Sequence, residues 1–471
     1  AKQGVVSAFA GFARSSGRFP LSAVGELNLY PLFAELSLHA INSRGKSGLI
    51  LKSMMFAAST WKDLTDSLIT KGSLESVFDF KNWEMLFSSV GYHERYSVAT
   101  FDASESKPLL RLAVGLTNPS ALSEEGSVIE IDRGLPRKLN PDSGTLPQCE
   151  SAEDLRILSR VASQFPTLGN SSWSAKYTSG LHMTGDASEL HDLETLEAEG
   201  FKLQGGWLVG DSASFVPVYE GKLIHQYDHR FATFEGIPRE NRFGIKAATI
   251  NPSDDKKAWP EFEIIPRYWV SQQFQQENGR SRSINPYWNI AFRDTTNVIS
   301  NFRTAVACIV GDCAFNYKAP NIVINDGNPL ESAIFLSMFN STPFDYLVRQ
   351  KFYGANFTKS ILLQSFVVPV ENIQGDHERL LDAVVALTNT SRSVHRFAED
   401  LGRAHLRTTD PEERLKLRAW IDAVYFKAFG FSSPEAAYVF DTFRIWKDKS
   451  EEKWGTFREK EEALAFMEQD G

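Results

Sequence analysis

Apolar residues in the first hundred positions switch repeatedly between helical and strand-like spacing. Residues 25–41 carry apolar side chains every three or four positions, which predicts a helix, and residues 61–70 repeat the pattern. Short apolar runs at 48–53, 73–82 and 95–102 predict buried strands. Helices that alternate with buried strands indicate an α/β sheet with parallel strands. Because these strands are fewer than a doubly wound sheet needs, we expect this segment to hold half of such a domain.

The pattern changes further along the chain. Pro, Gly and Ser recur over 106–212, where residues 151–166 alone show clear helical spacing. Short runs of aromatic and β-branched residues characterise 213–372, and the tail, 373–471, is largely helical and acidic. The sequence therefore predicts four parts: the second half of an α/β domain (1–105), a connecting region, an α+β region and a helical C-terminal region.

Composition and charge narrow the setting. The three cysteines among 471 residues make no disulfide framework and suit a reducing cytoplasm. No apolar run is long enough to span a bilayer, no signal peptide is evident, and the start at Ala1 without a helix or strand signal predicts a missing N-terminal part. The net charge is −9, yet residues 221–370 hold 16 Lys and Arg against 13 Asp and Glu. A locally basic block in an acidic chain is compatible with one nucleic-acid face.

The segment PVYEGKLIHQYDHRFATF, residues 217–234, concentrates candidate chemistry. His225 and His229 lie four positions apart with Asp228 between them, which allows a metal-dependent enzyme as one hypothesis. The segment lacks the glutamate of the H-E-x-x-H zinc motif, and no third ligand is close in sequence. Histidines that serve as ordinary hydrogen-bonding groups are the commoner case.

Nucleic-acid recognition is the second hypothesis for this segment, because cations hold phosphates and aromatic rings stack on bases. Its candidate contacts are Lys222, Tyr227, His229 and Arg230. Two further polar segments, 293–304 and 349–360, add side chains able to contact phosphates or base edges. Their candidates are Arg293, Asn297, Asn301, Arg303, Arg349, Lys351, Asn356 and Lys359, with Gly354 as a point where backbone can approach a phosphate.

Established catalytic signatures are absent from the sequence. It has no G-x-S-x-G nucleophile elbow, no phosphate-binding G-x-x-x-x-G-K-[ST] loop and no G-x-G-x-x-G after a strand. Cys308 and Cys313 form a single close pair without a second pair nearby, which is typical of buried or idle thiols rather than a metal site.

Several segments, in order, resemble one enzyme family. GELNLYPLFAELSLHAINSRGKSGLILKS and VFDFKNWEMLFSSVGYHERYSVATF look like the helix and strands that follow the catalytic motif of adenine-N6 DNA methyltransferases of the Eco57I-like, type IIG restriction-modification class. PVYEGKLIHQYDHRFATF, IIPRYWV, WNIAFRDTTNVISNFRT and FDYLVRQKFYGANFTKSILLQSFVVPV resemble their target-recognition region. IDAVYFKAFGFSSPEAAYVFDTFRIWKDKSEEKWGTFREKE is similar to their C-terminal tail. The resemblance covers most of the chain except about 103–212.

The resemblance implies a fold and a chemistry. It implies a partial Rossmann-like methyltransferase half over 1–105, a target-recognition domain over 213–372, and a helical C-terminal region. Such enzymes transfer a methyl group from S-adenosylmethionine to the N6 atom of an adenine flipped out of double-stranded DNA. Tyr96, on a predicted strand, resembles the family's aromatic residue near the flipped base.

Two family elements, the NPP[YFW] motif and the glycine-containing cofactor loop, do not occur in this sequence. We therefore expect part of a DNA methyltransferase from a restriction-modification or phage-defence system, inactive alone, whose cofactor site lies largely outside this chain. Its partner would be the missing N-terminal catalytic part or a second subunit. The alternative is a non-catalytic DNA-binding or assembly subunit of a defence complex. On either hypothesis, replacing Arg293 and Arg303 by Ala is expected to weaken DNA binding.

Overall fold

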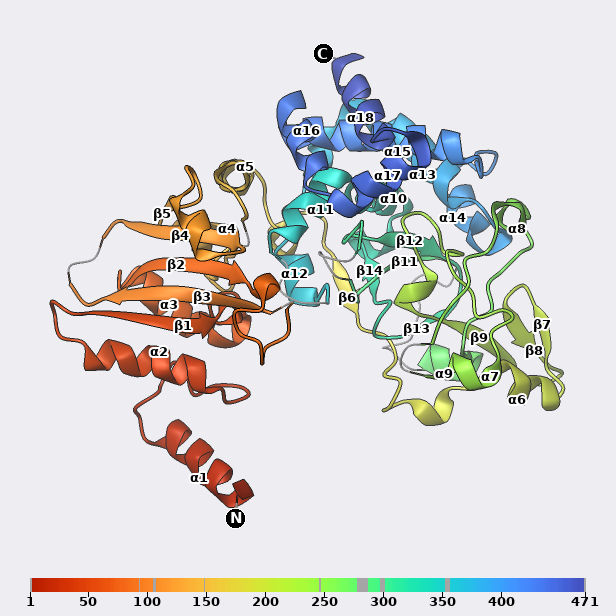
Figure 1. Cartoon of the computed structure of the whole chain (residues 1–471). Coiled ribbons are helices and arrows are strands. Elements are labelled where there is room, and N and C mark those ends of the chain that lie inside the picture. Colours follow the sequence, from red (N-terminus) through yellow and green to blue (C-terminus); the bar gives the residue numbers. More distant parts are fainter. Residues whose placement is uncertain are drawn as a thin grey trace. The chain divides into compact units, whose positions relative to one another are not determined.

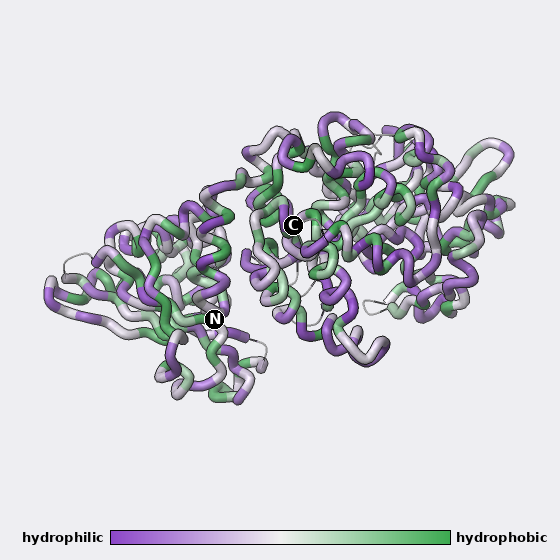
Figure 2. The backbone as a smooth tube through the Cα atoms, turned by 90° about the horizontal axis from the view of Figure 1, so that it is seen from above, coloured by the Kyte–Doolittle hydropathy of each residue, from purple (hydrophilic) through white to green (hydrophobic). Residues whose placement is uncertain are grey.

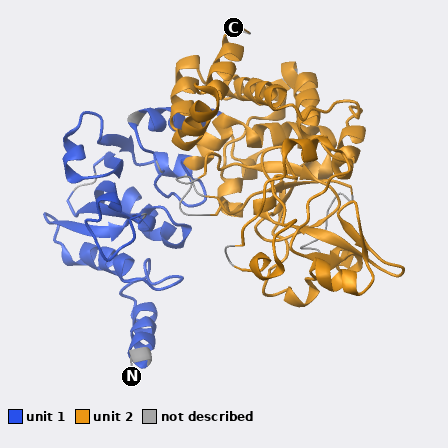
Figure 3. Ribbon diagram, turned by 45° about the vertical axis from the view of Figure 1, so that its right-hand side comes forward, with its two compact units in different colours: residues 1–164, 350–353 blue, residues 165–349, 354–471 orange. Residues whose placement is uncertain are grey.

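The computed structural model describes residues 2–92, 94–104, 107–147, 149–244, 247–277, 287–296, 301–351 and 356–469. Its contacts divide the chain into two compact units (Figure 3). Unit 1 comprises residues 1–164 and 350–353, and unit 2 comprises residues 165–349 and 354–471. The predicted connecting region, 106–212, is thus shared between the units. Its first part joins unit 1 because two of its strands extend the sheet of that unit.

Unit 1 is built on one five-stranded sheet with the order β1-β3-β2-β4-β5 (Figure 1). Its strands are β1 (Lys46–Lys52), β2 (Leu74–Lys81), β3 (Arg95–Asp102), β4 (Leu109–Leu116) and β5 (Ile129–Asp132). Its helices are α1 (Lys2–Ser15), α2 (Leu29–Ala40), α3 (Lys62–Thr70), α4 (Leu135–Leu139) and α5 (Ala152–Gln164). The predicted helices and strands of the first hundred residues are confirmed to within a few positions.

The predicted parallel arrangement of unit 1 is wrong for β3, and β5 at the far edge also pairs antiparallel, with β4. β3 runs antiparallel between β1 and β2, which are parallel to each other, and β4 runs parallel to β2. The reason is the connection: α3 separates β1 from β2, whereas the β2–β3 segment contains only a short 3₁₀ turn at Asn82–Glu84. A parallel neighbour needs a crossover, usually a helix, so a connection without one favours antiparallel pairing.

One side of unit 1 keeps apolar side chains in solvent. β1 is an edge strand, paired with β3 alone among the described residues. On α2, the side chains of Leu29, Phe33 and Leu36 are 58%, 57% and 43% exposed. The opposite stripe of α2 buries Leu32, Ala34 and Glu35, and the Glu35 carboxylate accepts hydrogen bonds from the Ser22 backbone and hydroxyl groups.

Unit 2 contains two small sheets and a helical region, so the predicted mixed α/β architecture with a helical C-terminus is confirmed. One sheet has the order β10-β9-β8-β7 with β13 beside β9, and the other has the order β12-β11-β14-β6. The strands are β6 (Lys176–Thr178), β7 (Lys202–Gln204), β8 (Trp207–Val209), β9 (Ser214–Tyr219), β10 (Trp269–Ser271), β11 (Asn289–Phe292), β12 (Ala307–Val310), β13 (Ala314–Phe315) and β14 (Asn321–Val323).

The helices from α13 onward form the C-terminal part of unit 2, coloured blue in Figure 1. The helices of unit 2 are α6 (Leu193–Ala198), α7 (Arg239–Arg242), α8 (Asp254–Ala258), α9 (Gln272–Glu277), α10 (Pro329–Asn340), α11 (Thr342–Arg349), α12 (Lys359–Leu363), α13 (His377–Thr388), α14 (His395–Asp400), α15 (Pro411–Ala428), α16 (Ser433–Asp441), α17 (Arg444–Trp454) and α18 (Arg458–Gln469). α10 is buried on all sides from Ser332 to Asn340, as expected of a helix that is apolar around its whole circumference. It therefore forms the centre of the helical region.

Hydrophobic and hydrophilic residues alternate along the backbone of both units (Figure 2). Among the described residues, no helix has the length and apolar character that crossing a membrane requires.

Candidate functional site

Tyr96, the predicted base-pocket residue, belongs to an apolar cluster of unit 1. Its ring is half-buried on β3 and stacks on Phe80 with 5.3 Å between the ring centroids. Phe87 meets the same ring edge-on at 4.8 Å. Burial, followed by the charges of Glu84 and Asp79, raises the pKa of the phenol. No described cavity of unit 1 is lined by Tyr96, so its role near a base stays a prediction.

Most predicted DNA contacts in 217–234 have internal roles, which corrects the sequence interpretation. Arg230 is 1% exposed, and its guanidinium donates to the carbonyl oxygens of Lys257, Trp259, Phe262 and Thr390. The guanidinium therefore holds irregular backbone together and has no surface to offer DNA.

His229 and Lys222 are also used within unit 2. His229 is 1% exposed with its Nε2 atom 2.9 Å from the Ser391 hydroxyl, and burial together with nearby Arg230 lowers its pKa to about 3. Lys222 is half-buried and donates to the Ala247 carbonyl oxygen at 2.9 Å. His229 is therefore neutral at physiological pH and cannot attract a phosphate.

The metal hypothesis fails on geometry. The backbones of His225 and Asp228 bond to each other in a turn, but the side chains diverge. The His225 ring lies between Phe231 and Phe302, the Asp228 carboxylate pairs with Lys257 at 2.6 Å, and His229 faces a serine. Among the residues that the structure describes, no group of three or more His, Cys, Asp and Glu is arranged to hold a metal ion.

Arg293 and Arg303 are likewise structural. The Arg293 guanidinium donates to the carbonyl oxygens of Gly221, at 2.9 Å, and Ile224. Arg303 is 4% exposed and forms a buried ion pair with Asp345, with 2.7 Å between its Nε atom and the carboxylate. Both guanidinium groups are therefore engaged in contacts within unit 2.

The remaining candidates differ in their surroundings. Lys351 is buried in unit 1, where its Nζ atom donates to the Leu139 carbonyl oxygen at 2.8 Å and burial lowers its pKa to about 7. Asn301 is half-buried and donates to the Thr296 hydroxyl at 3.1 Å. Asn356 is exposed. Asn297 and Gly354 lie outside the described residues.

Parts of two predicted segments, 293–304 and 349–360, nevertheless meet Lys318 in one place, which we call the polar junction: Asp294, Thr295, Lys318 and Asn356. Thr295 bridges the backbone of Asn356, and Lys318 donates to the side chains of Asp294, at 3.2 Å, and Asn356, at 3.0 Å. Arg293 then ties this junction to the 217–234 segment through its two carbonyl contacts.

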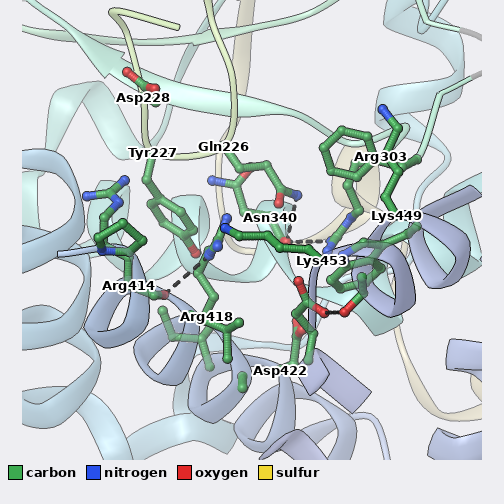
Figure 4. Close-up of a pocket in the computed structure, with 18 of the residues that line it drawn as sticks. Gln226, Tyr227, Asp228, Arg303, Asn340, Arg414, Arg418, Asp422, Lys449 and Lys453 are labelled. Atoms are coloured by element: carbon green, nitrogen blue, oxygen red, sulfur yellow. Dashed lines mark hydrogen bonds between the residues drawn. The ribbon is translucent and has the colours of Figure 1, made fainter. Parts of the chain in front are cut away.

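A second candidate site is a cavity of about 380 Å³ in unit 2, which we call the basic cavity. Its wall comes from α15, α17 and the turn at residues 226–230, with Arg303 and Asn340 at the back (Figure 4). Seven Lys and Arg residues line it against four Asp and Glu residues. Its volume falls within the range of small-molecule sites.

Tyr227 lines the basic cavity with an unusual backbone. Its φ angle of 59° lies in the left-handed region, which costs on the order of 1–3 kcal/mol for a bulky residue. Its side chain is 2% exposed, and its hydroxyl has no hydrogen-bond partner among the described residues. Burial raises the pKa of this phenol far above its ordinary value, so the hydroxyl stays a proton donor.

The sequence interpretation missed the other side chains of this cavity. Arg418 comes from α15, and Lys449 and Lys453 come from α17. The available signal was the spacing of the two lysines, since residues four apart share one helix face. The acidic average of the tail concealed it.

S-adenosylmethionine is the cofactor implied by the family resemblance. Two cavities of unit 1 measure about 30 and 230 Å³, below the usual range for ligands of this kind. The larger is lined by Arg133, Arg137 and Lys138 and lacks an aromatic ring. No step of a reaction is therefore assigned to this cofactor here.

Comparisons with known proteins find remote structural likeness alone. No protein-family model and no curated protein matches the sequence. The Type IIL restriction-modification enzyme MmeI, solved in complex with DNA, aligns with 88% of this chain and 51% of its own at 14% identity and a TM-score of 0.43. The type IIG restriction endonuclease BpuSI aligns with 90% of this chain and 52% of its own at 12% identity and a TM-score of 0.30. The chain spans about half the length of these enzymes, and likeness this distant assigns no family.

Proposed function

We propose that this chain is part of a site-specific DNA adenine-N6 methyltransferase of a restriction-modification or phage-defence system, in which unit 2 recognises double-stranded DNA. The observation that carries the proposal is the polar junction. Members of two segments chosen separately for their DNA-binding chemistry, 293–304 and 349–360, come together there although some sixty residues separate Thr295 from Asn356 along the chain. Arg293 links this place to the third segment, 217–234.

The junction presents groups suited to a phosphate backbone and base edges. Lys318 and Asn356 reach the surface, and Lys359 is exposed nearby with its Nζ atom 5.9 Å from the centre of the Tyr177 ring. Ammonium groups bind phosphates without regard to sequence, whereas the amide of Asn is the side chain that reads adenine. We therefore assign positioning to the two lysines and assign sequence reading to Asn356.

Two surface features of unit 1 are suited to binding another protein part, which would carry the catalytic motif. An edge strand offers unpaired backbone groups, and a row of exposed apolar side chains favours burial against another surface. β1 provides such an edge, and Leu29, Phe33 and Leu36 of α2 provide such a row. S-adenosylmethionine and the NPP[YFW] motif would belong to that further part, since the sequence holds neither this motif nor the glycine-containing cofactor loop.

DNA binding by the purified chain tests the proposal. The Lys318→Ala/Lys359→Ala double variant is expected to weaken duplex binding and to reduce the slope of log affinity against log salt by up to about 2, one unit for each lost phosphate contact. Lys202→Ala is the matched control, because this exposed lysine lies on β7, away from β6 and α12 (Figure 1). An unchanged salt slope in the double variant would place DNA elsewhere.

A methyl-transfer assay tests the catalytic part. We expect labelled S-adenosylmethionine to leave no label on adenine-containing duplexes incubated with these 471 residues, because the sequence holds no NPP[YFW] motif. The same duplexes with an intact adenine methyltransferase serve as the positive control. Incorporation of label by the chain alone would contradict the proposal.

A further inference from the structure

The basic cavity has more cationic than anionic side chains in its lining. Three of its four carboxylates are already engaged: Asp228 pairs with Lys257, Asp422 accepts from the Thr342 backbone and hydroxyl groups, and Glu459 accepts from Ser450. In the part of the chain that the structure describes, neither Lys449 nor Lys453 forms an ion pair. Cations that outnumber the nearby carboxylates favour an anionic ligand.

Arg418 differs from the two lysines because its planar guanidinium holds several N–H donors in fixed directions. Its Nε atom donates to the Arg414 carbonyl oxygen at 3.3 Å, and no described residue accepts from its terminal amino groups. In Figure 4 its side chain extends from α15 toward Tyr227, while Lys453 reaches across from α17. A guanidinium fork binds two oxygens of a phosphate at once, and an ammonium group binds a third as a point charge.

The Tyr227 hydroxyl completes the arrangement. It is a buried donor aimed into the cavity, and it lacks a partner among the described residues. A native structure rarely leaves such a buried group unsatisfied without a reason, and a ligand is one such reason. The left-handed backbone at Tyr227 is strained, and strained residues cluster at ligand-binding and active sites.

We propose that the basic cavity binds a phosphate group carried by a small ligand no larger than a nucleoside monophosphate. Arg418 and Tyr227 bind the phosphate at the floor, and Lys449 and Lys453 close over it from the rim. The volume of about 380 Å³ limits the size of the ligand. A duplex reaches the exposed lysines of the rim but not Tyr227, which is 2% exposed, so a free phosphate monoester is the assigned source.

This site is independent of the proposed DNA contact. The polar junction is built from Lys318 and Asn356, whereas the cavity side chains come from α15, α17 and the turn at Tyr227. Loss of one activity therefore leaves the other in place, and the two proposals can fail separately.

Isothermal titration of the full chain with adenosine monophosphate and with inorganic phosphate tests the inference, with sodium chloride titrated at matched ionic strength as the blank. We expect saturable binding that falls about tenfold or more in Lys449→Ala/Lys453→Ala, because hydrogen bonds between charged partners are the stronger ones. Lys447→Ala is the matched control on the same helix, since Lys447 lies near Asp441 and Glu451 and does not line the cavity.

Two more variants examine the floor. Tyr227→Phe removes only the hydroxyl, and Arg418→Gln removes the charge; both are expected to weaken phosphate binding while the urea unfolding curve of Tyr227→Phe stays close to that of the original chain. Absence of saturable binding by either ligand, or binding unchanged in both the double-lysine variant and Tyr227→Phe, would overturn the inference.

A competition experiment identifies the source of the phosphate. We expect adenosine monophosphate to remain bound when a saturating duplex is added. Displacement by the duplex would overturn the assignment to a free ligand and make the phosphate that of the DNA backbone. Failure of duplex binding with adenosine monophosphate binding intact would remove the proposed DNA function and leave this site standing.

Discussion

Replacing Arg303 by Ala is expected to destabilise unit 2 rather than to remove a DNA contact. Arg303 and Asp345 are 4% and 0% exposed, and their ion pair joins the residues before β12 to α11. The remaining guanidinium nitrogens donate to the Thr342 hydroxyl at 3.2 Å and to the Asn340 carbonyl oxygen at 2.7 Å. Truncation therefore leaves a buried carboxylate and two further acceptors with fewer donors.

The magnitude follows from what remains around Asp345. Breaking a buried ion pair by removing one partner costs about 3–5 kcal/mol. The Arg349 Nε atom still lies 3.3 Å from the carboxylate, and the Thr304 backbone N–H still donates to it at 3.0 Å. Because these donors keep part of the compensation, we expect a loss near the lower end, about 3 kcal/mol of unfolding free energy.

Urea denaturation followed by tryptophan fluorescence measures this loss. The Trp446 ring centre lies 4.8 Å from the Arg303 guanidinium, so its emission follows unfolding of unit 2. Arg392→Ala is the control, because Arg392 is 78% exposed in its pair with Glu261 and surface pairs contribute under about 1 kcal/mol. If Arg303→Ala unfolds at the same urea concentration as the original chain yet binds duplex more weakly at matched salt, the reasoning is refuted and Arg303 contacts DNA.

Three further predictions concern titration and packing. Burial lowers the pKa of Lys351 to about 7 from 10.5, so the unfolded state binds more protons than the folded state between these two pH values. The unfolding free energy of unit 1 should therefore rise with pH from about 7 to 10.5, and Lys351→Met should flatten this rise. The pKa of His229 falls from 6.5 to about 3, so unit 2 should lose stability as the pH drops through that range, and less so in His229→Gln; equal acid sensitivity would argue against this account. Gly221→Ala should destabilise unit 2 by more than about 1 kcal/mol in urea, because the added Cβ clashes with the Lys318 carbonyl oxygen, whereas Gly244→Ala, which meets no atom within 4 Å, should not.

The sequence predicts α2, α3, α5 and the first three strands of unit 1 because helix and strand periodicity are local properties, whereas α1, α4, β4 and β5 were not predicted. The helix expected at 25–41 is α2, and the strand expected at 95–102 is β3. Strand direction is different, because it depends on how a connection folds back over the sheet. The β2–β3 connection contains no helix, and this feature decides the antiparallel placement that the alternation of elements did not indicate.

The candidate DNA contacts were harder to predict, because a cationic side chain in an irregular segment can either bind a phosphate or donate to carbonyl oxygens of its own chain. The backbone of 217–234 leaves β9 at Tyr219 and continues largely without strand pairing, so nearby carbonyl oxygens need donors from side chains. Arginine has five N–H donors and suits this purpose, and Arg230 uses its two terminal amino groups on four carbonyl groups. Residue type alone does not separate such an arginine from one that faces a phosphate.

The same reasoning explains why the strongest anion site lies where the average charge is least favourable. Net charge reflects the whole surface, whereas binding depends on the few charges that lack a partner. The tail is acidic, yet its carboxylates Asp422 and Glu459 already accept hydrogen bonds, while Lys449, Lys453 and the terminal amino groups of Arg418 do not have described acceptors. Unpaired cations, rather than excess cations, therefore define the basic cavity, and pairing becomes visible only when the side chains are placed in three dimensions.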